Sequence, residues 1–136
     1  MFKKVMVPID MAHVVEGKAN IELAARYADE GAEILLLNVV EDIPGWAAAE
    51  LPRDLLDKSR RESESELKAI ATASGKTMET VVRSGHPYKT ILEVAEEKGV
   101  DLIIVASHRP GLQDYFLGST AAKVVRHAKC SVLVIR

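Results

Sequence analysis

The sequence predicts one doubly wound α/β domain, in which helices cover both faces of a parallel sheet. Three observations lead to this prediction. The chain has 136 residues, the length of one ordinary domain, and we expect residues 1–136 to form it. Short runs rich in Val, Ile and Leu show little polar alternation, which is typical of strands buried on both faces. Segments with helical periodicity separate these runs, as in a parallel sheet with crossover helices.

Four apolar runs and one weaker candidate are expected to form the strands. The runs are Val5–Ile9, Ile34–Val40, Leu102–Ala106 and Val132–Ile135, and the weaker candidate is Thr77–Val82. The resulting order is β-α-β-α-β-α-β-α-β. Right-handed crossover connections then restrict the topology to a doubly wound sheet.

Four helices are expected between the strands. They cover approximately residues 15–28, 55–70, 87–98 and 121–128, and Gly31, Gly75 and Gly99 follow the first three as stop signals. The stretch 41–53 (EDIPGWAAAELPR) is irregular and is expected to be a long loop. It holds the single tryptophan, Trp46, which we expect to close over the core.

Composition and charge exclude several function classes. The net charge is −2, the basic residues are scattered, and aromatic residues are 4% of the chain, so nucleic acid is a poor partner. One cysteine, Cys130, permits no disulfide framework and fits a reducing compartment. We find no signal peptide and no bilayer-spanning apolar stretch, and we expect a cytoplasmic protein.

Ligands of open α/β sheets bind outside the carboxyl ends of the strands, at the switch point in strand order. The segments that follow the strands there are Pro8-Ile9-Asp10, Val39 to Asp42, Ala106-Ser107-His108-Arg109 and Gly118-Ser119-Thr120. Ser119 is a candidate N-cap of the last helix, whose free N–H groups carry partial positive charge. With Arg109 nearby, this helix start predicts a phosphate site. Asp10 could accept hydrogen bonds from ribose hydroxyls or hold Mg²⁺ through water.

Plainer interpretations exist for the same residues. Ser119 and Asp10 could each be an ordinary helix cap. The spacing of His13, His86 and His127 suggests no metal site. Cys130 precedes an apolar strand and is expected to be a buried thiol without a chemical role.

Longer segments of the chain resemble the universal stress protein family. The opening KKVMVPID is similar to the first strand of that family, and Gly85-His86-Pro87 is similar to its turn before the third helix. The strongest likeness lies in LIIVASHRP, then YFLGS, then VVRHAKCSVLVIR. This tail resembles an ATP-binding branch of the family.

The resemblance implies a five-stranded parallel sheet of order 3-2-1-4-5 and a site for ATP, often with Mg²⁺. It places Pro8, Ile9 and Asp10 near the adenosine and the Val39 backbone against the adenine edge. It places Ala106, Ser107, His108, Arg109, Gly118, Ser119 and Thr120 around the ribose and phosphates. It also implies a homodimer formed by antiparallel pairing of the edge strand Ser131–Arg136.

The chain departs from the family's binding signature, Gly-x2-Gly-x9-Gly-Ser/Thr. Ala106 and Arg109 occupy the first two glycine positions, and the spacing from Arg109 to Gly118 is one residue short. Three functions therefore compete: an ATP-binding regulatory module in the stress response, a slow ATP-hydrolysing enzyme, and a ligand-free dimerisation or protein-interaction module. The chain has no P-loop pattern and no second carboxylate clearly paired with Asp10, so we expect a non-enzymatic module with at most slow, incidental hydrolysis.

Overall fold

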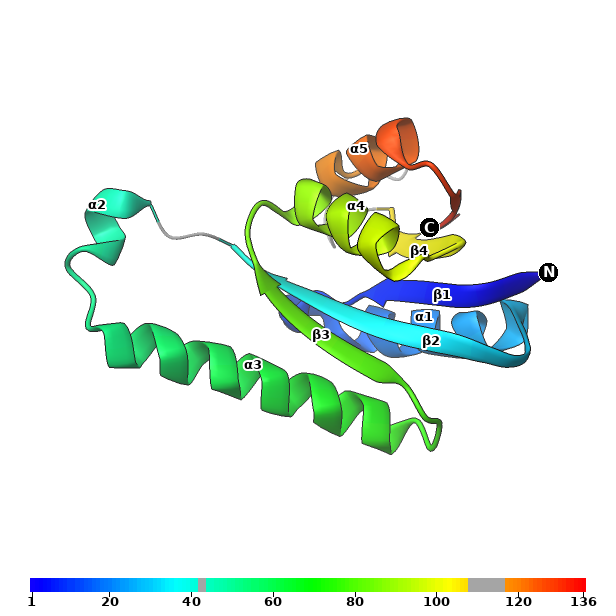
Figure 1. Cartoon of the computed structure of the whole chain (residues 1–136), viewed down its shortest axis with the longest axis horizontal. Helices are drawn as coiled ribbons and strands as arrows, with labels where there is room; N and C mark the ends of the chain where they lie inside the picture. The colour runs from blue at the N-terminus through cyan, green and yellow to red at the C-terminus, as the bar shows by residue number, and fades with distance from the viewer. Residues whose placement is uncertain (42–43, 108–116) are drawn as a thin grey trace.

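The computed structural model describes residues 1–41, 44–107 and 117–136, which alternate between strands and helices (Figure 1). The strands are β1 (Phe2–Pro8), β2 (Ala28–Val40), β3 (Glu79–Ser84), β4 (Leu102–Ala106) and β5 (Ser131–Ile135). The helices are α1 (Val14–Tyr27), α2 (Gly45–Ala48), α3 (Arg53–Ala73), α4 (Pro87–Lys98) and α5 (Ser119–His127), and a short 3-10 helix, η1 (Met11–His13), precedes α1.

The five strands form one parallel sheet of order β3-β2-β1-β4-β5. This order confirms the predicted doubly wound α/β class, with four helices of seven residues or more and the short α2 in addition. The order reverses between β1 and β4, because the chain first builds outward to β3 and then returns to the other side of β1. A switch point of this kind leaves a crevice at the carboxyl ends of the two central strands.

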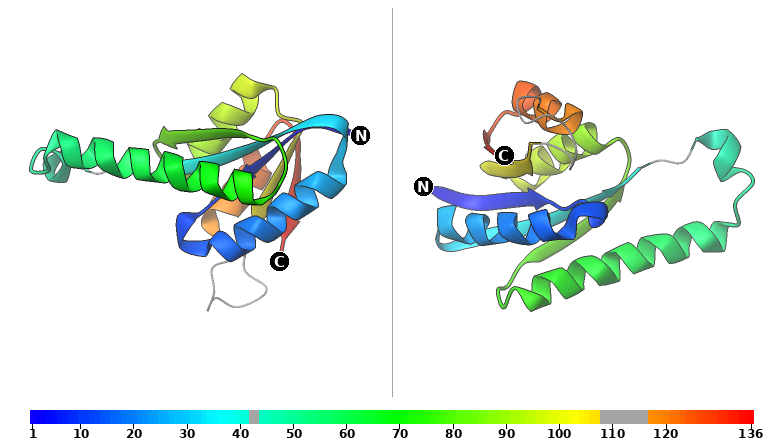
Figure 2. Two further views of the ribbon diagram at one scale, coloured as in Figure 1. Left: turned by 90° about the horizontal axis from the view of Figure 1, so that it is seen from below. Right: turned by 180° about the vertical axis from the view of Figure 1, so that it is seen from behind.

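Helices cover both faces of the sheet and bury two apolar layers (Figures 1 and 2). On one face, α1 and α3 pack against alternate strand residues such as Val5 and Leu36. On the other face, α4 and α5 pack against the intervening residues such as Met6 and Leu35. All four of these strand residues are fully buried, which explains why the strand sequences lack polar alternation.

The prediction that Gly31 stops the first helix is wrong. Helix α1 ends at Tyr27, and Ala28 already pairs with Phe2 of β1. Gly31 lies instead within β2, where the register shifts between Phe2 and Lys4, and its φ is +79°. The irregular register requires a left-handed backbone at this point, which glycine adopts without steric cost. The weaker strand candidate is a real strand, shifted to Glu79–Ser84.

The loop predicted at residues 41–53 contains a short helix, α2, that lies beyond the end of the sheet together with the first half of α3 (Figure 1). The expectation that Trp46 closes over the core is wrong, since its side chain is 75% exposed. Within the 21 residues of α3, Leu67 and Ala71 are the buried ones. The carboxyl half of α3 therefore anchors this arm to the sheet.

Two leucines of α3 test this division of the helix. We expect Leu67→Ala to lower the free energy of unfolding by about 2–5 kcal/mol, because Leu67 is fully buried and its loss leaves a cavity. Leu55→Ala removes the same atoms from a side chain that is 51% exposed and should change stability by less than about 0.5 kcal/mol. Urea denaturation followed by circular dichroism measures both, and equal losses would contradict the division.

Candidate functional site

The central strands β1 and β4 part before their carboxyl ends, and a proline explains why. The Lys4 carbonyl accepts from Asp101 N–H at 3.0 Å, so Lys4, Met6 and Pro8 turn their backbone groups toward β4. Pairing of the two strands stops at Met6, although β4 continues to Ala106. Pro8 has no N–H to extend the ladder. The sheet therefore opens between β1 and β4 at the residue where proline follows.

Beside this opening, an asparagine side chain leaves the backbone of the last part of β2 unpaired on the side of β1. The Ile9 N–H donates to Leu37 O at 2.7 Å, and the Asn38 side chain donates from Nδ2 to Ile9 O at 2.9 Å. Asn38 thus completes the end of β1 in place of a strand partner. By alternation, Val39 turns its N–H and C=O to the same side as Leu37, where β1 has already ended. The backbone of Val39 presents one donor and one acceptor to the crevice.

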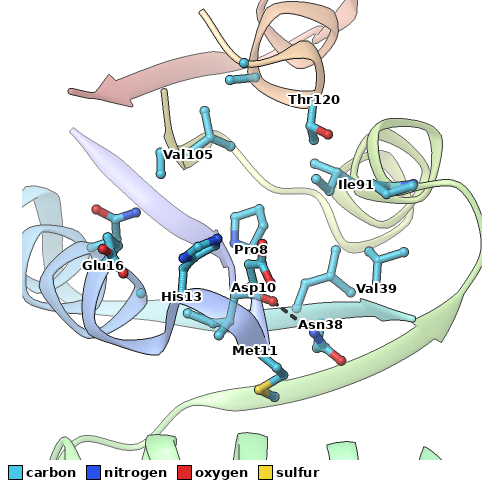
Figure 3. Close-up of a pocket in the computed structure, with 18 of the residues that line it drawn as sticks. Pro8, Asp10, Met11, His13, Glu16, Asn38, Val39, Ile91, Val105 and Thr120 are labelled. Carbon is cyan, nitrogen blue, oxygen red and sulfur yellow. Dashed lines mark hydrogen bonds between the residues drawn. The ribbon is translucent and has the colours of Figure 1, made fainter. Parts of the chain in front are cut away.

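The opening is the mouth of a cavity of about 450 Å³. Figure 3 shows Val39 and Ile91 on one wall, His13 and Glu16 on the opposite wall, and Thr120 above, with Pro8 and Asp10 between. Its lining includes every predicted site residue that the structure describes: Pro8, Ile9, Asp10, Val39, Ala106, Ser107, Gly118, Ser119 and Thr120. The other two predicted residues, His108 and Arg109, lie outside the described residues. The fold therefore brings together, around one cavity, the distant segments that the sequence predicted to form the site.

The amino terminus of α5 faces this cavity. Ala122 N–H donates to Gly118 O at 2.9 Å as the first bond of the helix, which leaves the N–H groups of residues 119–121 without helical partners. The predicted N-cap role of Ser119 is wrong. Gly118 holds the cap position without a side-chain bond, and Ser119 is the first helical residue. Ser119 and Thr120 both line the cavity, and no side-chain hydrogen bond caps the helix.

The end of β4 holds this helix terminus in place. Ser107 N–H donates to Ile135 O at 2.8 Å, and Gly118 N–H donates to Ser107 O. Ser107 is 3% exposed and thus joins β5 to the start of α5 below the protein surface.

Asp10 combines the capping interpretation with a place on the cavity. Its Oδ1 accepts from Ala12 N–H at 2.9 Å and caps η1, so the plainer of the two interpretations is correct for that oxygen. Asp10 is exposed and also lines the cavity, so its carboxylate can accept further hydrogen bonds there.

Sequence reasoning missed most of the cavity wall that α1 contributes. His13, Glu16, Gly17 and Asn20 line the cavity at helical spacing, on one side of η1 and α1. A Cβ at Gly17 would lie 2.9 Å from Ile9 Cδ1, so glycine allows α1 to approach the end of β1 closely. The available signal was this spacing of polar residues next to an apolar stripe. Asn38 was also missed, although it is the polar residue within the run Ile34–Val40.

The part of the cavity lining that the structure describes carries a net negative charge. It includes the carboxylates of Asp10, Glu16 and Glu41, and it includes no Lys or Arg. Among the described residues, no group of three or more His, Cys, Asp or Glu side chains is placed to hold a metal ion. Positive potential in this part of the cavity therefore comes from the helix terminus.

Cys130 lies away from this cavity, on a smaller one of about 190 Å³ between α4 and the start of β5. Cys130 is half-buried, whereas the sequence predicted a buried thiol. Burial raises the pKa of the Cys130 thiol, which favours the protonated and unreactive form.

Comparison with known proteins identifies the relationship. The family model described as the universal stress protein family matches residues 1–136. The chain belongs to the universal stress protein family. Among curated relatives, universal stress protein YxiE of Bacillus subtilis (strain 168) is 33% identical over 150 residues, with full coverage of both chains.

Solved universal stress protein structures share the fold. The structure of hypothetical protein MJ0577 superposes with a TM-score of 0.81 at 27% identity, covering 99% of this chain and 96% of that one. A universal stress protein in complex with cAMP superposes with a TM-score of 0.64 at 24% identity, covering 99% and 97%. In the part of this family member that the structure describes, no helix is both long and apolar enough to cross a membrane.

Substitution of two buried asparagines tests the hydrogen bond from Asn38 to the Ile9 carbonyl. We expect Asn38→Leu to cost about 1–2 kcal/mol of stability, because the Ile9 carbonyl loses its donor. The matched control is Asn20→Leu, since Asn20 is also buried and its side chain has no hydrogen bond within the described residues. Chemical denaturation measures both variants, and a loss as large for Asn20→Leu would contradict this role of Asn38.

Proposed function

We propose that this universal stress protein is a cytoplasmic regulatory module of the stress response that binds an adenine nucleotide, ATP first of all, in the cavity between β1 and β4. The observation that carries the proposal is the presence of complementary groups at the two ends of one cavity. The free Val39 backbone lies at one end and the α5 terminus at the other. The single half-buried Cys130 suits a reducing compartment.

The Val39 end suits adenine. The base edge carries an acceptor at N1 beside a donor at N6, and the backbone N–H and C=O of one strand residue match that pair. The apolar side chains of Val39, Ile91 and Val105 line the same cavity and offer contact surfaces for the ring. Pro8 lines the cavity nearby and carries no N–H that would compete for the base.

The α5 end suits the phosphates. Three N–H groups of a nine-residue helix, together with the Ser119 and Thr120 hydroxyls, supply donors and partial positive charge. Asp10 is then the acceptor between the two ends, at the ribose. The carboxylates of the cavity would hold Mg²⁺ only through its water and the phosphates, since the described residues offer no cluster of direct ligands.

We expect binding and not efficient catalysis. One carboxylate oxygen of Asp10 accepts the hydrogen bond that caps η1. Among the described residues, no hydrogen bond joins the Asp10 carboxylate to a histidine side chain or to a second carboxylate that could act with it as a general base. ATP turnover measured at saturating Mg-ATP should therefore stay slow. Rapid hydrolysis that is lost on changing Ser119 would contradict this expectation.

Calorimetric titration of the purified protein with Mg-ATP tests the proposed function. We expect Asp10→Ala to weaken binding by about 1–3 kcal/mol, as for a lost hydrogen bond between a charged and a polar group. Asp57→Ala on α3, an exposed carboxylate outside the cavity lining, is the control and should leave affinity unchanged. Mass spectrometry of any nucleotide released on denaturation checks the ligand independently. Absence of binding and of a thermal shift with Mg-ATP would favour the ligand-free alternative.

We also propose a homodimer through β5, the edge strand of the sheet. The Ile135 carbonyl bonds to β4 through Ser107, so by alternation Val132 and Val134 turn their backbone groups outward. These outward groups and the half-buried apolar side chains of β5 are what an antiparallel partner strand would use.

A proline at Val134 distinguishes the hydrogen bonds that β5 makes to β4 from those that it would make to a partner strand. Val134→Pro removes an outward N–H while leaving the ladder to β4 its own donors, because proline is tolerated on the solvent side of an edge strand. We expect the dimer to dissociate in light-scattering measurements while the circular dichroism spectrum is retained. Val134→Ala should remain dimeric, and a dimer that survives Val134→Pro would refute pairing through β5.

A further inference from the structure

One polar side chain on the cavity wall has no role in the site described so far. Asn20 of α1 is 3% exposed, yet its amide makes no hydrogen bond within the described residues. No buried polar atom is left without contact to either a partner or accessible space, so the Asn20 amide reaches the cavity. A buried amide is costly unless something in the cavity satisfies it. The Asn20 amide is thus available to a molecule that occupies the cavity.

The neighbours of Asn20 give this wall its chemistry. Glu16 lies one helical turn before Asn20 and His13 lies one turn before Glu16, on the wall opposite Val39 (Figure 3). Glu16 is a carboxylate that accepts hydrogen bonds and cannot donate them. Glu16 also has no ion pair within the described residues. The α1 wall therefore attracts hydrogen-bond donors and repels anions.

The geometry of a ribose selects which part of a nucleotide meets this wall. A ribose has three substituted corners: the base at C1′, the phosphate at C5′, and the hydroxyl pair at C2′ and C3′. The proposed function directs the first corner to Val39 and the second to the start of α5. The remaining corner then turns toward Asp10 and the α1 wall, where Glu16 and Asn20 provide acceptors.

We propose that Glu16 and Asn20 form a specificity filter that admits a nucleotide with a free 2′,3′-diol and rejects one phosphorylated at either hydroxyl. This inference rests on the proposed adenine-nucleotide site and adds to it the choice among adenine nucleotides. The Asn20 carbonyl oxygen accepts from a ribose hydroxyl. The Glu16 carboxylate accepts from the neighbouring hydroxyl and repels a phosphate attached there.

Paired ligands that differ by one phosphate test the rejection. Titration calorimetry compares AMP with adenosine 2′,5′-bisphosphate and adenosine 3′,5′-bisphosphate. We expect the wild-type protein to bind AMP more tightly than the bisphosphates by about tenfold, and Glu16→Gln to reduce this preference by about fivefold, the size of a like-charge interaction at a partly solvated site. Glu22→Gln changes the same charge on the exposed part of α1 outside the cavity lining and should keep the preference.

A second pair tests recognition of the diol. We expect wild type to bind ATP about tenfold more tightly than 2′,3′-dideoxy-ATP, and Asn20→Leu to narrow that ratio by weakening ATP alone. Equal binding of AMP and its bisphosphates, or ratios unchanged in Glu16→Gln and Asn20→Leu, would overturn the filter while the nucleotide site stands. Failure of every adenine nucleotide to bind wild type would instead refute the proposed function itself.

Discussion

The missing N–H of Pro8 is the constraint on which the site depends. Every hydrogen bond between neighbouring parallel strands needs a backbone N–H donor and a C=O acceptor. Pro8 faces β4 and cannot donate, so the ladder between β1 and β4 ends at Met6. The pairs on either side continue, β1 with β2 to Pro8 and β4 with β5 to Ala106. At the switch point in strand order, the missing donor thus ends the ladder between β1 and β4, while β1 stays paired with β2 and β4 with β5.

The cavity that opens there has hydrogen-bond donors on one side and acceptors on the other. The start of α5, held by the bond from Gly118 to Ser107, supplies unpaired donors. The wall of α1, brought close by Gly17, supplies acceptors and negative charge. A ligand with an anionic end and a donor-rich middle matches this gradient, and a nucleotide has that distribution. The charges of the lining therefore favour one orientation of the ligand over its reverse.

The sequence carries the fold and part of the site. The strands were predictable because burial on both faces removes polar alternation, as in the run from Ile34 to Val40. Pro8, Asp10 and Gly118 were predictable because the carboxyl ends of parallel strands meet at one edge. The role of Asn38 was not, because its bond to Ile9 joins segments 29 residues apart. The cap of α5 was misassigned by one residue, the usual uncertainty at a helix end.

The exposure of Trp46 has a practical consequence for spectroscopy. This residue is the single tryptophan of the chain, and it lies on α2, away from both apolar layers. Its side chain is 75% exposed in the native protein, so its emission should shift little when the sheet unfolds. Tryptophan fluorescence will therefore report on the surroundings of α2 and change little on global unfolding.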